Sequence, residues 1–231
     1  MSESMRRNKP DRRSNEKKAV SRPRPTEQRR GTGPISVLLV ASLRLEFFRQ
    51  VLEGITNGLG SAASLHCTEH SEGILRAIHE HGIQGVLLGV SNRRVHRTLL
   101  RRGMPCVNVS NLFPSPHPSV LNDDEAVGRM AAEFFLNNGY RRFAYVGHSL
   151  HRYSQERQKG FEAWLRQHDC RCSVWLDLQQ HPHLLREGLR TMPPPLAIFA
   201  ATDYLAAHVY RQIREMGRLV PEEVAILGVD N

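Results

Sequence analysis

The sequence has only four cysteines and no apolar run long enough to cross a membrane. Cys67, Cys106, Cys170 and Cys172 have spacings that match neither a disulfide framework nor a paired zinc knuckle, so we expect reduced thiols. The N-terminal residues also lack the apolar region of a secretory signal. These absences argue against a membrane protein and a disulfide-rich secreted protein, and they predict a cytoplasmic location with no membrane partner.

Motifs for cofactors and metals are also lacking. The turn after the first apolar run, Ala41-Ser42-Leu43-Arg44, has no glycine-rich cradle for phosphate, which argues against a nucleotide-dependent enzyme. His79 and His81 are two residues apart, so a helix would point them to different faces and no four-ligand set forms. We therefore expect no cofactor and no metal.

One stretch comes close to a hydrolase motif. Residues 147–151, Gly-His-Ser-Leu-His, resemble the G-x-S-x-G nucleophile elbow, and Asp177 or Asp203 followed by His208 stand in hydrolase order. However, His151 occupies a position that needs a small residue, and no oxyanion loop precedes it. An esterase stays as an alternative, while our prediction is that the chain is not an enzyme and has no catalytic residue.

Positive charge is concentrated at the N-terminus. The first 33 residues hold 11 Arg or Lys against 4 Asp or Glu, so they contribute +7 of the formal +9. Because this segment has almost no large apolar residue, it cannot bury enough surface to offset its ordering entropy. We predict that residues 1–33 are a disordered basic tail. It is a solvated extension, the product of a start codon placed too early, or an arm that neutralises phosphates without reading sequence.

From residue 34 onward, apolar runs of strand length alternate with amphipathic stretches of helix length, a pattern typical of α/β proteins with parallel sheets. The expected strands are residues 35–41, 65–67, 85–90, 105–109, 143–147, 173–175, 196–200 and a last run within 220–231. The expected helices are residues 45–59, 72–81, 93–102, 123–138, 153–168, 184–191 and 204–216. We predict an N-terminal lobe over residues 34–121 and a C-terminal lobe over residues 122–231.

Polar residues follow the carboxyl ends of these strands. Asp203 follows one apolar run, and Asp230 and Asn231 follow the next. Parallel sheets bind ligands in the crevice at these strand ends, and carboxylates, amides and guanidinium groups suit the hydroxyls of a polyol. Four aromatic residues offer faces for a sugar ring, although core packing is the better explanation for any single one; they are Phe47, Phe48, Tyr153 and Tyr204.

Three segments resemble the effector-binding domains of LacI/GalR-like, sugar-responsive transcription regulators. The first is residues 195–231, with two strands that end on Thr202-Asp203 and Asp230-Asn231. The second is residues 122–147, in which an Asp-capped helix ends at Gly139 and two arginines precede a strand. The third is residues 154–161, where Arg157 stands three residues before a glycine. The xylose operon regulators, with a C-terminal AraC-type DNA-binding module, are the most similar members.

The resemblance implies a two-lobed, periplasmic-binding-protein-like (type I) fold with sugar contacts from Asp123, Arg157, Asp203, Asp230 and Asn231. Arg49, in an Arg-Gln pair followed by Glu-Gly, resembles the xylose-regulator version of the N-terminal lobe and joins this ligand set. From the residues alone, Asp123 is equally a pure helix cap. An exposed helix arginine paired with a neighbouring acid is the better interpretation of Arg157 by itself, and the resemblance favours a ligand contact instead.

The same resemblance implies a homodimeric regulator that senses xylose or a related pentose by lobe closure. Its DNA partner would be bound by a helix-turn-helix module that these 231 residues do not contain, so no residue of this chain is expected to read DNA. Such a domain needs further strands after Asn231, so we expect a fold that is truncated at the C-terminus. The alternative is a solitary sugar-binding protein or a non-functional regulator fragment.

Overall fold

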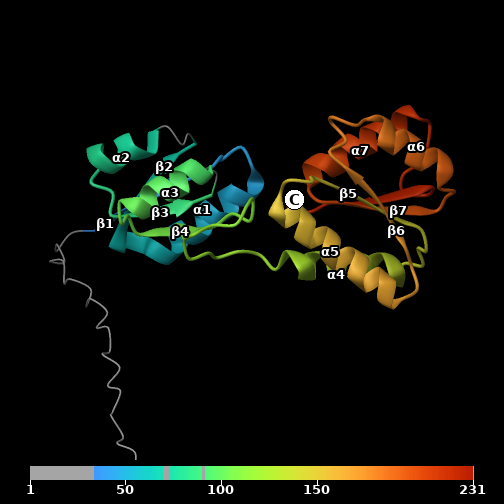
Figure 1. Ribbon diagram of the computed structural model, residues 1–231, viewed down its shortest axis with the longest axis horizontal. Helices are drawn as coiled ribbons and strands as arrows, with labels where there is room; N and C mark the ends of the chain where they lie inside the picture. Colours follow the sequence, from blue (N-terminus) through green and yellow to red (C-terminus); the bar gives the residue numbers. More distant parts are fainter. Residues whose placement is uncertain (1–33, 70–72, 90–91, 231) are drawn as a thin grey trace, which may run out of the picture. The chain divides into compact units, whose positions relative to one another are not determined.

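Two parallel four-stranded sheets organise the computed structural model, which describes residues 34–69, 73–89 and 92–230 (Figure 1). One sheet is built from the N-terminal half of these residues and the other from the C-terminal half. The predicted basic tail and the proposed ligand residue Asn231 lie outside the described residues.

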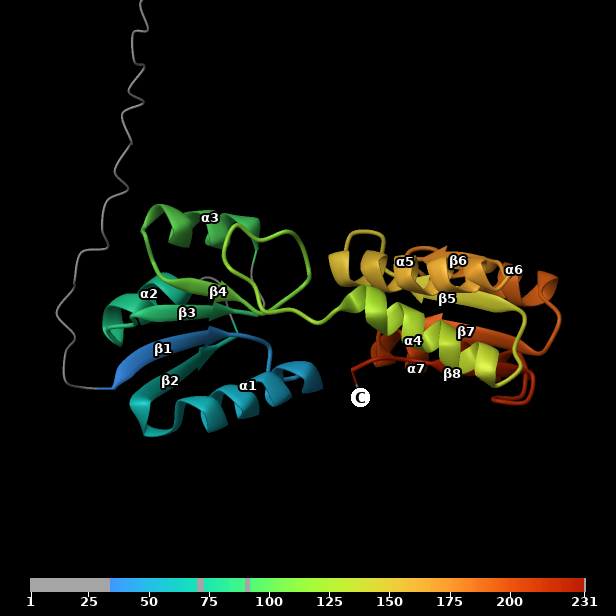
Figure 2. The same ribbon diagram turned by 90° about the horizontal axis from the view of Figure 1, so that it is seen from below.

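The N-terminal lobe has the strand order β2-β1-β3-β4. Its elements are β1 (Ile35–Val40), α1 (Glu46–Leu59), the 3-10 turn η1 (Gly60–Ala62), β2 (Ala63–Thr68), α2 (Ile74–Glu80), β3 (Gly85–Leu88), α3 (Arg93–Arg101) and β4 (Cys106–Asn108). Helix α1 covers one face of the sheet through Phe48, while α2 and α3 cover the other through Ile74 and Leu99, as Figure 2 shows. Both faces are apolar, which explains the nearly continuous hydrophobic strands.

After β4 the chain forms a loop whose far end, at residues 118–120, pairs with the last residue of β4. The backbone nitrogen of Asn108 donates to the carbonyl of Pro118 at 2.8 Å, and Val120 donates back to Asn108 at 2.9 Å. Asn108 therefore fixes both ends of the loop, and its side-chain amide also donates to Ser110 at 2.9 Å.

The C-terminal lobe has the strand order β6-β5-β7-β8. Its elements are α4 (Asp124–Asn137), β5 (Phe143–Gly147), α5 (Arg152–Gln167), β6 (Cys172–Leu176), α6 (His183–Thr191), β7 (Leu196–Ala200), α7 (Asp203–Glu215) and β8 (Val224–Leu227). Figure 1 shows α4 and α5 on one face of this sheet and α6 and α7 on the other. The central strands β5 and β7 are buried along their whole length.

Helices α4 and α5 pack with their backbones in close approach. A methyl group added at Gly128 would overlap the carbonyl of Arg157, and one added at Gly160 would overlap the carbonyl of Glu125. Small residues at both crossing points are therefore required. The close approach also holds Asp124 on α4 beside Arg157 on α5.

The predicted α/β fold with parallel sheets is confirmed, and the observed elements begin and end within about two residues of most of the expected ones. The lobe boundary between residues 121 and 122 stays a prediction. Within the described part of the chain, every helix is too short or too polar to span a bilayer.

Candidate ligand-binding site

A pocket of about 580 Å³ opens at the carboxyl ends of the parallel strands, a size common for sites of small ligands. The segments after β1, β4, β5, β7 and β8 all contribute to its wall. The lining includes most of the residues singled out in the sequence: Phe47, Phe48, Arg49, Tyr153, Arg157, Asp203, Tyr204 and Asp230.

Arg157 is the centre of the polar wall. Its side chain is only 5% exposed, and its Nε donates to Asp124 Oδ1 at 2.7 Å. Its Nη1 donates to the carbonyl of Ala201 at 2.5 Å, and its Nη2 lies 3.6 Å from Asp230 Oδ1. The guanidinium also lies over the Tyr153 ring, 5.2 Å from the centroid. Arg157 is thus a buried arginine that links α4, α5 and the ends of β7 and β8.

Asp230 stands at the end of the last described strand, in an unusual backbone conformation. Its φ is +100°, in a region that side chains other than glycine rarely adopt and that the surrounding structure must enforce. Burial raises the pKa of Asp230; the Arg157 guanidinium opposes that effect, and the neighbouring Asp203 adds to it. The carboxylate is two-thirds buried, with one oxygen directed at Arg157.

Asp203 begins α7, directly after the helix cap Thr202, whose hydroxyl accepts from the backbone of Leu205 at 3.3 Å. The Asp203 backbone nitrogen donates to the carbonyl of Val229 at 2.7 Å, which ties the start of α7 to the chain after β8. A methyl group at Gly228 would overlap the Asp203 carboxylate. Because Gly228 has no side chain, the Asp203 carboxylate can lie directly against the backbone at the end of β8.

The other predicted ligand residues differ in their positions. Asp123 caps α4 by accepting from the backbone of Ala126 at 3.0 Å and is not among the pocket residues, whereas the next residue, Asp124, is. Arg49 lines the pocket, but Glu46 and the carbonyl of Leu43 engage its guanidinium. Asp123 and Arg49 stay predictions as ligand contacts, as does Asn231, which lies outside the described residues.

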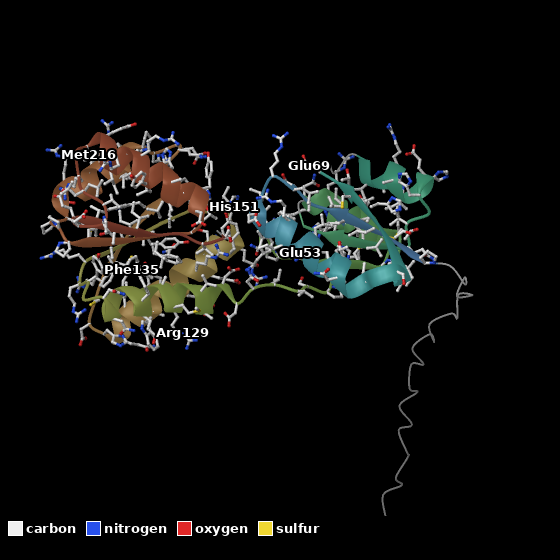
Figure 3. The ribbon with its side chains drawn as sticks, turned by 180° about the vertical axis from the view of Figure 1, so that it is seen from behind. Glu53, Glu69, Arg129, Phe135, His151 and Met216 are labelled. Atoms are coloured by element: carbon white, nitrogen blue, oxygen red, sulfur yellow. The ribbon has the colours of Figure 1, made fainter. Side chains whose placement is uncertain are left out.

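Aromatic and imidazole rings border the same wall. Burial raises the pKa of Tyr153 to about 12, against the opposing effect of Arg157, so its hydroxyl stays protonated at neutral pH. That hydroxyl lies 3.1 Å from His151 Nδ1. Burial, and then His148, lower the pKa of His151. His151 lines the pocket, and Figure 3 shows it at the opposite end of the C-terminal lobe from Met216. The wall therefore offers neutral donors and acceptors beside the charged network.

Asn111 is a pocket residue that the sequence analysis missed. Its Nδ2 donates to Asp124 Oδ2 at 2.7 Å and to Glu156 Oε2 at 2.5 Å. Its Oδ1 is buried and accepts no hydrogen bond from any described residue. Its backbone carbonyl accepts from Tyr153 at 2.8 Å, at the start of α5. No local pattern marks Asn111, because its partners lie up to 45 residues away.

The esterase alternative finds no support in the positions of its residues. The Ser149 backbone donates to Asp177 Oδ1 at 3.1 Å, and His148 Nδ1 lies 3.7 Å from the same oxygen. His208, the proposed base, instead lies 2.7 Å from the Gln212 amide on its own helix. Across residues 34–69, 73–89 and 92–230, His, Cys, Asp and Glu side chains form no group of three or more suited to a metal ion.

Comparisons with known proteins agree with this geometry. A family model described as a periplasmic binding protein-like domain matches residues 132–231. The xylose operon regulatory protein of Escherichia coli (strain K12) is 24% identical over 214 residues, which cover 84% of this chain and 54% of that protein. The chain thus spans about half the length of this curated relative.

Two solved structures are similar over most of the chain. A xylose-binding transcription activator matches with a TM-score of 0.72 and 22% identity, covering 87% of this chain and 55% of the other. A LacI family transcriptional regulator from Enterococcus faecium, solved with bound ribose, matches with a TM-score of 0.68 and 22% identity, covering 85% and 78%. The described part of the chain thus has a periplasmic-binding-protein-like fold and is similar to the effector-binding domains of LacI/GalR-like transcription regulators.

Proposed function

We propose that this chain is the effector-binding portion of a sugar-responsive transcription regulator, and that its pocket takes xylose or a related pentose. The observation that carries the proposal is the fixed network of Asp124, Arg157 and Asp230 on the pocket wall, with Asp203 beside it. The relatives are transcription regulators, one structure of which holds ribose.

The chemistry of the network suits vicinal hydroxyls. In the proposed complex, Asp203 and Asp230 accept hydrogen bonds from sugar hydroxyls, and the remaining N–H groups of Arg157 donate to hydroxyl oxygens. Asp124 orients the guanidinium, so we assign it a positioning role. Tyr153 and Tyr204 supply apolar ring faces for the carbons of the sugar. Arg49, Asp123 and Asn231 complete the predicted ligand set.

Regulation is proposed to work by linkage. A sugar that contacts residues from both lobes favours the closed form only by its higher affinity for that form. Closure would then change the spacing of DNA-binding modules joined to the two subunits of a homodimer. A cytoplasmic location follows from this role.

The direct test is thermal unfolding of the full chain with D-xylose, L-arabinose or D-ribose. At a sugar concentration about 100 times Kd, binding stabilises the folded state by about 2.7 kcal/mol, or roughly 5–10 °C in Tm for a domain of this size. We expect the shift with a pentose and its absence in Asp230→Ala and Asp203→Ala. No shift with any polyol would contradict the proposed ligand class.

The matched control is Asp169→Asn. Asp169 also has a left-handed backbone, with φ +56°, but it lies after α5 and away from the pocket. We expect the pentose response to survive in this variant, so an equally weakened response there would refute the site assignment. Asp123→Asn keeps a capping oxygen, and a reduced pentose affinity in that variant would establish Asp123 as a ligand contact.

DNA retention separates a regulator from a solitary sugar-binding protein. The gene product as expressed in its native cell is passed over genomic DNA fragments of that cell at moderate salt, with and without pentose. Sequence-specific retention that changes with the sugar supports the regulator. Cooperative melting with sugar but no specific retention supports the sugar-binding alternative.

A further inference from the structure

Helix α3 of the N-terminal lobe carries a cluster of exposed arginines that the sugar site does not use. The helix buries His96 and Leu99 against the sheet. Five of its exposed positions are arginines: Arg93, whose guanidinium also lies 5.8 Å from the centroid of the Phe113 ring, Arg94, Arg97, Arg101 and the cap residue Arg102. We call these five residues the α3 arginine surface.

No carboxylate of the described residues forms an ion pair with the α3 arginine surface. Glu46 pairs with Arg49, and Glu53 projects from α1, which covers the opposite face of the sheet (Figure 3). Arg97 Nε makes only a weak contact, 3.4 Å long, with the carbonyl of Arg93. The positive charge of the surface is therefore not neutralised within the described fold.

The arrangement works against the helix itself. Arg93, Arg97 and Arg101 are spaced four residues apart, so like charges stack along one side, at a cost of about 0.2–0.5 kcal/mol per pair. Arg93 and Arg94 also stand in the first turn, where the helix dipole disfavours cations. A bound polyanion would relieve both effects.

We infer that the α3 arginine surface binds the phosphate backbone of duplex DNA. Four residues of helix rise about 6 Å, so successive guanidinium groups can reach separate phosphates, each in the bidentate geometry that arginine favours. Clustered arginines along one helix are the electrostatic footprint of such binding. These contacts position the protein on DNA without reading its sequence, and they go beyond the proposed sugar function.

An acidic protein is the other class of polyanion, and the surface fits it less well. Protein interfaces draw most of their affinity from aromatic or aliphatic anchors in desolvated pockets. Among the exposed positions of α3, Leu100 is the large apolar residue, and it lines neither the ligand pocket nor the pocket between α4 and α5. Phosphate contacts need no such anchor, so DNA is the better match.

The test compares the salt dependence of DNA binding by the full chain and by the triple variant Arg94→Gln, Arg97→Gln, Arg101→Gln. For a short random-sequence duplex, the slope of log K against log salt falls by about 0.9 for each phosphate that the protein no longer neutralises. We expect a slope smaller by roughly 2–3 in the triple variant. Glutamine keeps good helix propensity and the variant loses the like-charge pairs, so a Tm equal to or slightly above that of the parent protein should accompany the smaller slope.

The matched control is Arg186→Gln, Arg190→Gln, Arg211→Gln, which removes the same charge from exposed positions of α6 and α7. The basic tail is present in all three proteins, so its contribution cancels. A slope unchanged in the α3 variant, or reduced equally in the control, would overturn the inference. Binding of polyglutamate as tight as binding of DNA would also overturn it, in favour of an acidic protein partner.

Discussion

Asn111 donates both hydrogens of one amide to two different carboxylates, those of Asp124 and Glu156. Without this donor, two negative groups face each other in a half-buried site, and the Asp124 oxygen that does not bind Arg157 is left without its donor. We expect Asn111→Ala to lower the free energy of unfolding by about 1–3 kcal/mol, as measured by urea denaturation.

Asn138→Ala is the comparison for Asn111→Ala. Asn138 is exposed, and its amide donates to the carbonyl of Phe134 at 2.8 Å within one helix end. Because water replaces that bond, we expect a change below about 0.5 kcal/mol. If the two variants are destabilised equally, the bridge between the carboxylates contributes nothing of its own.

Some of the individual pocket residues could be predicted from the sequence and others could not. Asp203 and Asp230 follow strand ends, and parallel topology alone predicts that such residues share one edge. The prediction of Asp123 depended on a helix start, where neighbouring residues point in directions about 100° apart. Asp124, one position later, is the residue on the pocket. A capping pattern locates a helix end but does not resolve which of two adjacent carboxylates faces inward.

At the scale of elements, the crossing of α4 and α5 positions the polar network. Gly160→Ala would place a methyl group in the backbone of Glu125, and the helices must separate to make room. We expect the free energy of unfolding to fall by about 1–3 kcal/mol, together with a weaker pentose response, because Asp124 moves away from Arg157. Urea denaturation and pentose-dependent Tm measure the two effects.

Gly58→Ala in α1 is the control, because the added methyl group there has free space. A methyl group there meets nothing within 4 Å, and the backbone is helical. We expect a gain of about 0.5–1 kcal/mol, since alanine has the higher helix propensity. A gain from Gly160→Ala as well would mean that the two helices do not require a glycine at their crossing.

The sequence predicted the positions of helices and strands better than the contacts between them. Strands β5 and β7 begin and end at the predicted residues, because both are fully buried apolar runs. The edge strand β2 is longer than predicted, since most of its side chains are polar or small and give no clear pattern. Hydrogen bonds between distant segments, as at Asn111, leave no local pattern at all.

For the molecule as a whole, the two lobes have unequal cores. The five largest fully buried side chains of the described residues, Tyr145, Phe135, Phe143, Phe161 and Phe199, all belong to the C-terminal lobe. The N-terminal lobe divides its core into two smaller clusters on opposite faces of its sheet. Because apolar burial dominates stability, the N-terminal lobe should be the weaker of the two.

Native-state hydrogen exchange should reveal this inequality. We expect amides of β1 and β3 to open at a lower free energy than those of β5 and β7, although all four strands are central in their sheets. A pentose that contacts residues from both lobes adds its binding energy to every opening that destroys the site, so it should slow exchange in β1 and β3 as well. Slowing confined to β5 and β7 would mean that the ligand is held by the C-terminal lobe alone, and lobe closure would then have no driving force.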